Sequence, residues 1–180
     1  NGDPDAYAPL RGHLAAGTSI YINPHATVGG SVTPTGNPAT FPIAFRANPG
    51  FTYGSPNLGY LAGGQTYTLT AGDYTNLNVG SNATIVLTAG EYNFSRLDWT
   101  GSGTQFVADT SMGDIILNFA NGGSIGSDVT FTNTGGNDFL FQSGGRVSFG
   151  ARAHLDGSIY VFGSGDLTLG ASAFVSGQVY

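Results

Sequence analysis

The sequence predicts an all-β fold, namely a single-stranded parallel β-helix (β-solenoid) with coils of about 20 residues. Three observations lead to this prediction. Short alternating apolar runs are separated by Gly, Asn and Ser, no window has a helical apolar period, and one internal repeat keeps a near-constant spacing. We expect one domain spanning 1–180, because this length suits a single domain and 40% hydrophobic residues are enough for a core.

The alternating runs favour strands over helices. Each run places β-branched or aromatic residues at every second position, which is the period of a half-buried strand. The runs are 67–70, 77–79, 115–119, 129–131, 147–149 and 167–169. A β-sandwich would show turn signals at short intervals but would not keep a repeat in register along the chain.

The internal repeat predicts the stacking. Segments 19–32, 146–159 and 166–179 align without gaps. A column of apolar residues that step by 20 or 22 positions is expected to point inward, coil after coil: Val79, Trp99, Phe119, Phe141 and Val161. A second column is expected at a tight inner corner where a larger side chain would not fit: Ala26, Ala83, Ala153 and Ala173. Glycines are expected to supply the left-handed backbone positions of the corners.

Proline divides the chain into parts. All eight Pro lie at or before Pro56. We therefore expect an N-terminal segment (1–18), a first coil (19–32), a Pro- and aromatic-rich insertion (33–66) and the main solenoid (67–180). The insertion is predicted to be an ordered loop that packs over the side of the solenoid.

The repeat units resemble a known architecture. GRVSFGARAHLDGSI (145–159) and GDLTLGASAFVSGQV (165–179) are similar to the right-handed β-helix domains of bacterial surface proteins. The pilus-associated and filamentous-haemagglutinin-type proteins are nearest in style, and the bactofilins share the general plan. The resemblance implies a right-handed solenoid and a place at the cell surface, and it specifies architecture more than activity.

Composition excludes several classes of protein. The net charge of −6, with five Arg and no Lys, argues against a nucleic-acid partner and against binding to an anionic membrane. No apolar stretch is long enough for membrane insertion. The absence of Cys excludes disulfides and thiolate sites. The Gly-, Ser-, Thr- and Asn-rich composition favours a secreted or cell-surface protein, and no cofactor is expected.

Three carboxylates are candidates for a calcium site. The units 69–74 and 87–92 are near copies, so stacking is expected to bring Asp73 next to Glu91, with Asp114 as a third rung. Such a column of oxygen ligands suits Ca²⁺ or, alternatively, an acid–base pair. The alternative is that all three are solvated turn residues.

Other polar residues carry no predicted chemistry. His13, His25 and His154 have neither metal-ligand spacing nor a catalytic arrangement, so we expect surface histidines. Trp99 is expected in the core, with Arg96 and Asp98 as a surface ion pair. The glycosylation patterns at Asn82 and Asn93 are of the kind that chance produces in such a chain. No catalytic residue is predicted, and the protein is not expected to be an enzyme.

The function hypotheses follow from the ends and faces of the solenoid. Open solenoid ends expose unpaired backbone groups, so the first hypothesis is an extracellular filament or surface-layer subunit that stacks head to tail. The residues expected at the assembly edges are Ile20, Ile22, Val28, Val175, Val179 and Tyr180. The alternative is an adhesive, glycan-binding or ice-binding module that uses outward columns of Thr, Ser and Asn. The third hypothesis is a polysaccharide-active enzyme.

Overall fold

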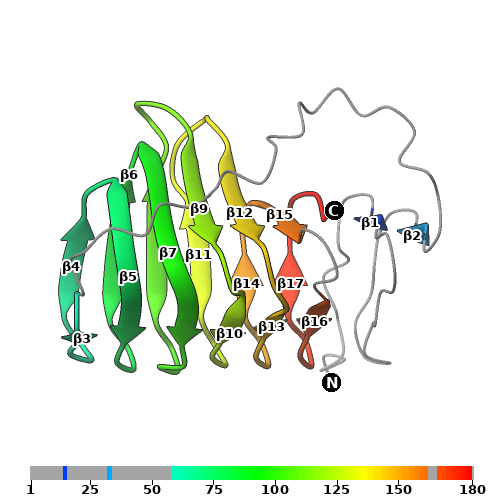
Figure 1. Ribbon diagram of the computed structural model, residues 1–180, viewed down its shortest axis with the longest axis horizontal. Coiled ribbons are helices and arrows are strands. Elements are labelled where there is room, and N and C mark those ends of the chain that lie inside the picture. The colour runs from blue at the N-terminus through cyan, green and yellow to red at the C-terminus, as the bar shows by residue number, and fades with distance from the viewer. Residues whose placement is uncertain (1–13, 16–31, 34–57, 162–165, 180) are drawn as a thin grey trace, which may run out of the picture.

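The protein is a parallel β-solenoid, seen side-on in Figure 1. The computed structural model describes residues 14–15, 32–33, 58–161 and 166–179, and no helix occurs among them. Every strand pairing within these residues is parallel, as the predicted fold class requires. Within this part of the chain, no helix is long or apolar enough to cross a bilayer.

The strands form three groups. A six-stranded sheet contains β4 (Thr66–Leu69), β6 (Thr84–Thr88), β8 (Gln105–Asp109), β11 (Thr130–Asn133), β14 (His154–Leu155) and β17 (Phe174–Val175). A nine-stranded sheet contains β3 (Tyr60–Leu61), β5 (Gly72–Val79), β7 (Gly90–Trp99), β9 (Ile115–Phe119), β10 (Gly123–Ile125), β12 (Phe139–Ser143), β13 (Val147–Phe149), β15 (Ser158–Val161) and β16 (Leu167–Leu169). A separate pair consists of β1 (Leu14–Ala15) and β2 (Val32–Thr33).

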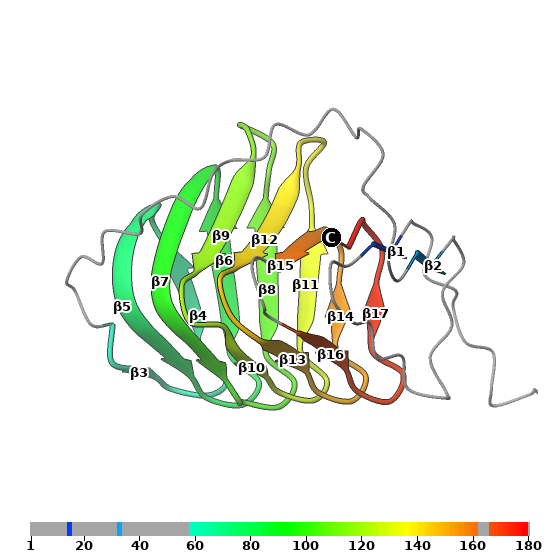
Figure 2. The same ribbon diagram turned by 45° about the vertical axis from the view of Figure 1, so that its right-hand side comes forward.

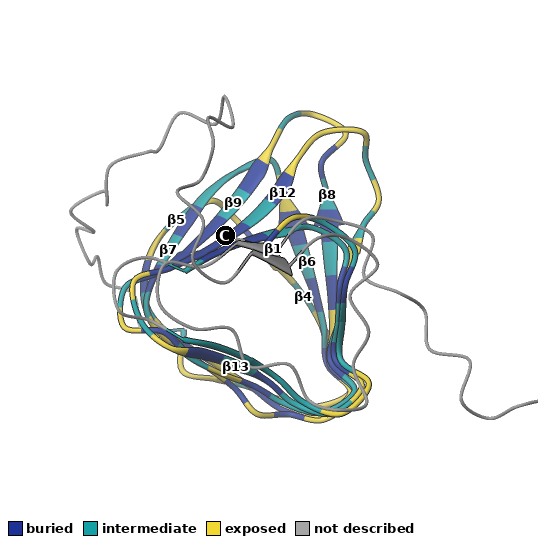
Figure 3. Cartoon of the chain, turned by 90° about the vertical axis from the view of Figure 1, so that its right-hand side faces the viewer, coloured by how far each residue is buried: buried dark blue, intermediate teal, exposed yellow. Residues whose placement is uncertain are grey.

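The nine-stranded sheet bends to make two faces of the solenoid. The first half of β7 pairs with β9, and its last three residues pair with β10. Together with the six-stranded sheet these two halves enclose a three-sided core, as the end-on view in Figure 3 shows. The chain therefore presents three outer faces, and β5 and β7 each run across two of them.

Coil length varies along the stack. Successive residues of one column on the six-stranded sheet are Thr66, Thr84, Gln105, Thr130 and His154, so the steps are 18, 21, 25 and 24 residues. The two longest coils contain the loops 110–114 and 134–138, which project beyond the other coils in Figure 2.

The predicted inner column is only partly correct. Val79 and Trp99 are neighbours, as expected, since the adjoining Asn78 pairs with Asp98. Trp99, however, pairs with Ile125, whereas Phe119 pairs with Phe94. The long loops shift the register, and a constant period cannot reveal that shift because most inward positions are apolar.

Aromatic rings fill the interior in stacks. Tyr74, Phe94 and Phe119 follow one another across coils with ring centroids 5.3 Å apart at each step. Trp99, 1% exposed as predicted, stacks on Phe106 at 4.1 Å. Offset stacks of this kind stabilise beyond the area that they bury. The interior of the solenoid is thus filled by packed side chains.

One corner of each coil requires a left-handed backbone conformation. Between β10 and β11, and at the equivalent turn of every other coil, one residue has a left-handed φ of 57–70°. These residues are Gly64, Asn82, Gly103, Asp128, Arg152 and Ser172. Glycine fills only two of these six positions, so the prediction that glycines supply the left-handed corners is wrong at this corner. At other turns it is confirmed, because the remaining described residues with positive φ are all glycines, namely Gly59, Gly72, Gly90, Gly113, Gly122 and Gly123.

The repeated glycine of the motif has another cause. A Cβ atom on Gly150 would lie 2.6 Å from the carbonyl carbon of Gly126, and one on Gly170 would lie 2.7 Å from the carbonyl carbon of Gly150. The coils approach too closely at this point for any side chain.

The inner alanine column is confirmed in part. Ala83 and Ala153 are fully buried, and Ala173 is partly buried against the core. The same column holds Thr104 and Val129 in the intervening coils, so larger side chains do fit there. Ala26 lies outside the described residues.

The solenoid begins before residue 67. Leu61 pairs with Val79 and Thr66 pairs with Thr84, so residues assigned to the insertion already form a coil. The predicted first coil (19–32) and most of the insertion (33–66) lie outside the described residues. β1 and β2 pair with an 18-residue spacing and lie beyond the C-terminal coil in both Figures 1 and 2.

Candidate functional site

The outer surface of β4, β6, β8 and β11 is rich in threonine. Burial alternates along each strand, so the outward residues can be named. We call the following nine residues the threonine patch: Thr66, Thr68, Thr84, Val86, Thr88, Gln105, Val107, Thr130 and Thr132. Six of the nine are Thr, and none carries a charge.

The threonine patch is a two-dimensional array. Thr66, Thr84, Gln105 and Thr130 form one column, and a second column contains Thr68, Val86, Val107 and Thr132. Neighbours within a column are separated by the strand spacing of about 4.8 Å, and the columns lie about 6.6 Å apart along the strands. Side chains therefore repeat at fixed intervals in both directions, with a methyl and a hydroxyl group at each Thr, methyl groups alone at Val86 and Val107, and an amide at Gln105.

The array is held rigidly from below. Ile85, Phe106 and Phe131 lie on the inner side of the same strands and are 0% exposed. Phe106 and Phe131 stack with ring centroids 4.6 Å apart. Thr and Val are restricted at χ1, so the outward side chains add little motion of their own.

Charged and aromatic groups lie outside the patch. Asp109 borders it at the end of β8, where hydrogen bonds from the hydroxyl and the amide of Ser111 lower the pKa of its carboxyl and keep it ionised. Among the described residues the exposed large apolar side chains are Tyr60 and Met112, and neither belongs to the patch. The nine residues of the patch therefore include no aromatic ring, and the rings of His154 and Phe174 continue the Thr66–Thr130 column beyond it.

A second face carries a row of amides and carboxylates. Asp73, Asn93, Asn118, Gln142 and Tyr160 are paired neighbours across five coils. The amide nitrogen of Asn93 donates to Oδ1 of Asp73 at 2.7 Å, and that of Asn118 donates to Oδ1 of Asn93 at 2.7 Å. Asn118 is only 1% exposed. We call this set the amide row.

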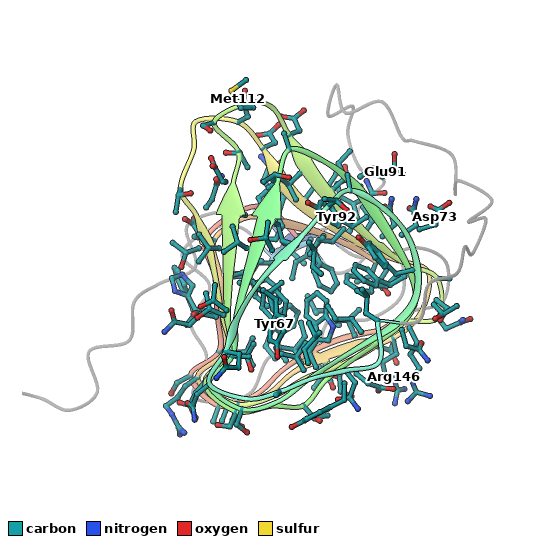
Figure 4. All side chains as sticks on the ribbon, turned by 90° about the vertical axis from the view of Figure 1, so that its left-hand side faces the viewer. Tyr67, Asp73, Glu91, Tyr92, Met112 and Arg146 are labelled. Atoms are coloured by element: carbon teal, nitrogen blue, oxygen red, sulfur yellow. The ribbon has the colours of Figure 1, made fainter. Side chains whose placement is uncertain are left out.

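The predicted calcium residues do not form a column. Asp73 lies opposite Asn93, and Glu91 lies opposite Ile116 (Figure 4 shows both carboxylates on the outer surface). Glu91 instead accepts a hydrogen bond from Nδ2 of Asn118 at 2.7 Å. Asp114 lies at the projecting loop, where its Oδ1 accepts from the amide of Asp138 at 3.0 Å. No three acidic or His side chains gather within the described part of the chain.

The projecting loops form a polar crest. Oγ1 of Thr110 donates to Oδ1 of Asn133 at 2.7 Å, and Asn137 donates through its side chain to the carbonyl of Thr110. Met112 lies at the tip and is 88% exposed (Figure 4). These bonds tie two coils together.

The third face carries paired charges. Arg96 and Asp98 form the predicted surface ion pair at 3.1 Å, and Arg146 binds Asp166 at 2.8 Å (Arg146 lies on the outside in Figure 4). All four side chains are well exposed, so each pair contributes little to stability. We call this surface the ion-pair face.

The remaining predicted residues are placed as follows. His154 is partly buried and lies 4.9 Å from the ring of Phe174, whereas His13 and His25 lie outside the described residues. Asn82 occupies an exposed left-handed corner. Asn93 belongs to the amide row.

The predicted assembly residues are described only in part. Val175 is fully buried and its strand pairs with β14, and Val179 bridges to Ile159. Both are core residues of the last coil. Ile20, Ile22, Val28 and Tyr180 lie outside the described residues.

Comparison with known proteins adds no family. No protein-family model, no curated protein sequence and no solved structure matches this chain. The threonine patch was foreseen only as a general tendency towards outward Thr, Ser and Asn columns. Its sequence signal is the Thr-x-Thr pattern of 66–68 and 130–132.

Proposed function

We propose that this protein is a secreted module that binds ice through the threonine patch. The single observation behind this proposal is the array itself: five Thr, two Val and Gln105 in two registered columns, with Thr88 beside them and no charge among the nine residues. The spacing along the columns is close to the shortest lattice repeat of ice. Each hydroxyl can take a lattice position for a water molecule, and each methyl group can sit in the space between such positions.

Rigidity makes a weak contact effective. One hydroxyl gains little by exchanging one water partner for another. A rigid array binds many ordered water molecules without losing side-chain entropy, so the small contributions add. The packed aromatic interior under β8 and β11 keeps the array flat and fixed.

A glycan ligand fits the patch less well. Sugar-binding surfaces commonly offer an aromatic ring for stacking, and the patch has none. The enzyme alternative gains no support from the patch, which contains only neutral side chains. Filament assembly is a separate hypothesis, which concerns the solenoid ends.

A pair of substitutions tests the proposal. Thr84→Tyr puts a ring in the middle of the array, whereas Asn78→Tyr puts the same ring on an exposed outward position of the ion-pair face. Wild-type protein and Asn78→Tyr are expected to show thermal hysteresis, to shape ice crystals and to enter growing ice. Thr84→Tyr is expected to lose most of all three while its circular dichroism and melting temperature stay unchanged.

Two outcomes would overturn the proposal. One is a folded wild-type protein that shows no thermal hysteresis and is excluded from growing ice. The other is equal activity in Thr84→Tyr and Asn78→Tyr, because ice would then bind elsewhere on the molecule.

A further inference from the structure

We infer that the N-terminal end of the solenoid pairs with the same end of a second copy of this chain. In this contact, β4 of one copy would pair with β4 of the other about a two-fold axis, so the assembly would stop at a dimer. This interface goes beyond the proposed ice binding and does not depend on it.

Within the described part of the chain, the N-terminal end of the solenoid leaves one strand edge unpaired. Among the described strands, β4 pairs only with β6, and β3 pairs only with β5. The amide of Thr84 donates to the carbonyl of Gln65 at 2.8 Å, so the backbone groups of Gln65, Tyr67 and Leu69 face β6. By alternation, the N–H and C=O groups of Thr66 and Thr68 face away from the stack.

This edge carries neither a charged residue nor a proline, although its strands are short. Natural edge strands are guarded by charge, proline or a bulge, because an unprotected edge recruits another strand. Residues 58–72 contain no charged residue and no proline. A second copy can therefore approach this end without like-charge repulsion, although the chain as a whole carries a net charge of −6.

The core is incompletely covered at the same end. Leu61 and Tyr67 are only partly buried, whereas their partners in the next coil, Val79 and Ile85, are 1% and 0% exposed. Tyr60 is 66% exposed at the rim. A second copy would cover the apolar end of the rod and bury these side chains against their own equivalents.

A two-fold arrangement satisfies the open edge. In an antiparallel pairing centred on Tyr67, Thr66 of one copy faces Thr68 of the other, and each such pair exchanges two backbone hydrogen bonds. The symmetry closes the assembly at two copies. A head-to-tail stack would also need the C-terminal end, beyond which β1 and β2 lie (Figure 1).

The dimer would double the binding surface. Paired residues of neighbouring strands project to the same side of a sheet, so the two threonine patches would form one continuous array. If the proposed ice binding also holds, the dimer is expected to bind ice more tightly than the monomer through avidity.

Edge substitutions at one position test the interface. Thr68→Pro removes the backbone N–H of residue 68, which points away from β6 and bonds to no described strand. Thr68→Val keeps that N–H. Sedimentation equilibrium above freezing, over a range of concentrations, is expected to give dimers for the wild type and Thr68→Val. Thr68→Pro is expected to be a monomer with an unchanged circular dichroism spectrum.

Cysteine cross-linking tests the register. The chain has no Cys, so the double variant Thr66→Cys, Thr68→Cys is expected to form disulfide-linked dimers on mild oxidation. Asn78→Cys, on the ion-pair face, is the control and is expected to cross-link poorly.

Three results would overturn this inference. They are a wild type that stays monomeric at high concentration, a Thr68→Pro variant as dimeric as the wild type, and an open-ended polymer. Because these measurements need no ice, their failure is separate from a failure of the proposed function.

Discussion

Arg152 and Asp128 occupy the same corner position in adjacent coils and form a two-point ion pair. Nε of Arg152 lies 2.6 Å from Oδ1 of Asp128, and Nη2 lies 2.7 Å from Oδ2. Both residues have left-handed backbones, with φ of 57° and 59°. Both residues thus adopt the strained left-handed conformation at equivalent corners, and this shared position brings their opposite charges together across adjacent coils.

This pair makes stability depend on pH. The hydrogen bonds from Arg152 hold the pKa of the Asp128 carboxyl below its usual value of 3.8. A carboxyl with a lowered folded-state pKa stabilises the fold above its unfolded-state pKa, and this contribution disappears as pH falls through the folded-state value. Asp128→Asn keeps a residue that tolerates a left-handed φ but removes the charge. We expect the wild type to be more stable than Asp128→Asn at neutral pH and the difference to vanish in strong acid.

Urea unfolding at several pH values measures this difference. Added salt is a second control, because the pair is exposed and salt screens exposed charges. A stability difference that stays constant from neutral to strongly acidic pH would contradict the assignment.

The left-handed corner also predicts opposite effects of one substitution at neighbouring positions. Ser172 has a φ of 58°, where a side chain is costly and glycine is not. Ser172→Gly is expected to raise the free energy of unfolding by about 0.5–1 kcal/mol. Ala171→Gly, one residue earlier and without a left-handed φ, is expected to lower it by a similar amount. Thermal melts of both variants check this, and equal signs would show that the corner is not strained.

Close stacking of coils predicts a large effect at Gly150. A Cβ atom there would lie 2.6 Å from backbone atoms of Gly126 and Ser127, which cannot move without disturbing the ladder. Gly150→Ala is therefore expected to lower the free energy of unfolding by about 3 kcal/mol. Gly136→Ala is the control, because its Cβ would meet nothing within 4 Å. Chemical denaturation of the two variants measures the difference, and similar stabilities would disprove close stacking.

The fold class could be read from the sequence because it depends on local patterns. Alternating β-branched and aromatic residues indicate strands, and repeated spacing indicates coils. The register could not be read in full. Phe119 and Ile125 are equally apolar, so nothing in the repeat says which of them lies opposite Trp99. Loop lengths decide that question, and they vary from coil to coil.

The candidate calcium site shows the same limit at one corner. The repeated units do stack at their first residues, since Leu69 pairs with Leu87. Past the corner, however, Asp73 pairs with Asn93, because the second coil uses two more residues to turn. As a result, the neighbour of Asp73 in the next coil is the side-chain amide of Asn93 and not the carboxylate of Glu91. The threonine patch was more accessible to prediction, because Thr-x-Thr marks outward positions wherever the strand lies.

The amide row predicts a cost for removing Asn118. Its side-chain nitrogen donates to both Glu91 and Asn93 at 2.7 Å, and the residue is 1% exposed. Asn118→Leu keeps the approximate side-chain volume but deprives these two oxygens of that donor. The substitution is expected to lower the free energy of unfolding by about 2 kcal/mol. Asn121→Leu removes an exposed bond to the carbonyl of Ser95 and is expected to cost less than about 1 kcal/mol.

Urea unfolding curves compare the two variants directly. A larger loss for Asn118→Leu would follow from burial, because water can replace the lost donor at an exposed site but not at a shielded one. Equal losses would mean that water reaches the amide row, and the row would then contribute no more than surface hydrogen bonds do.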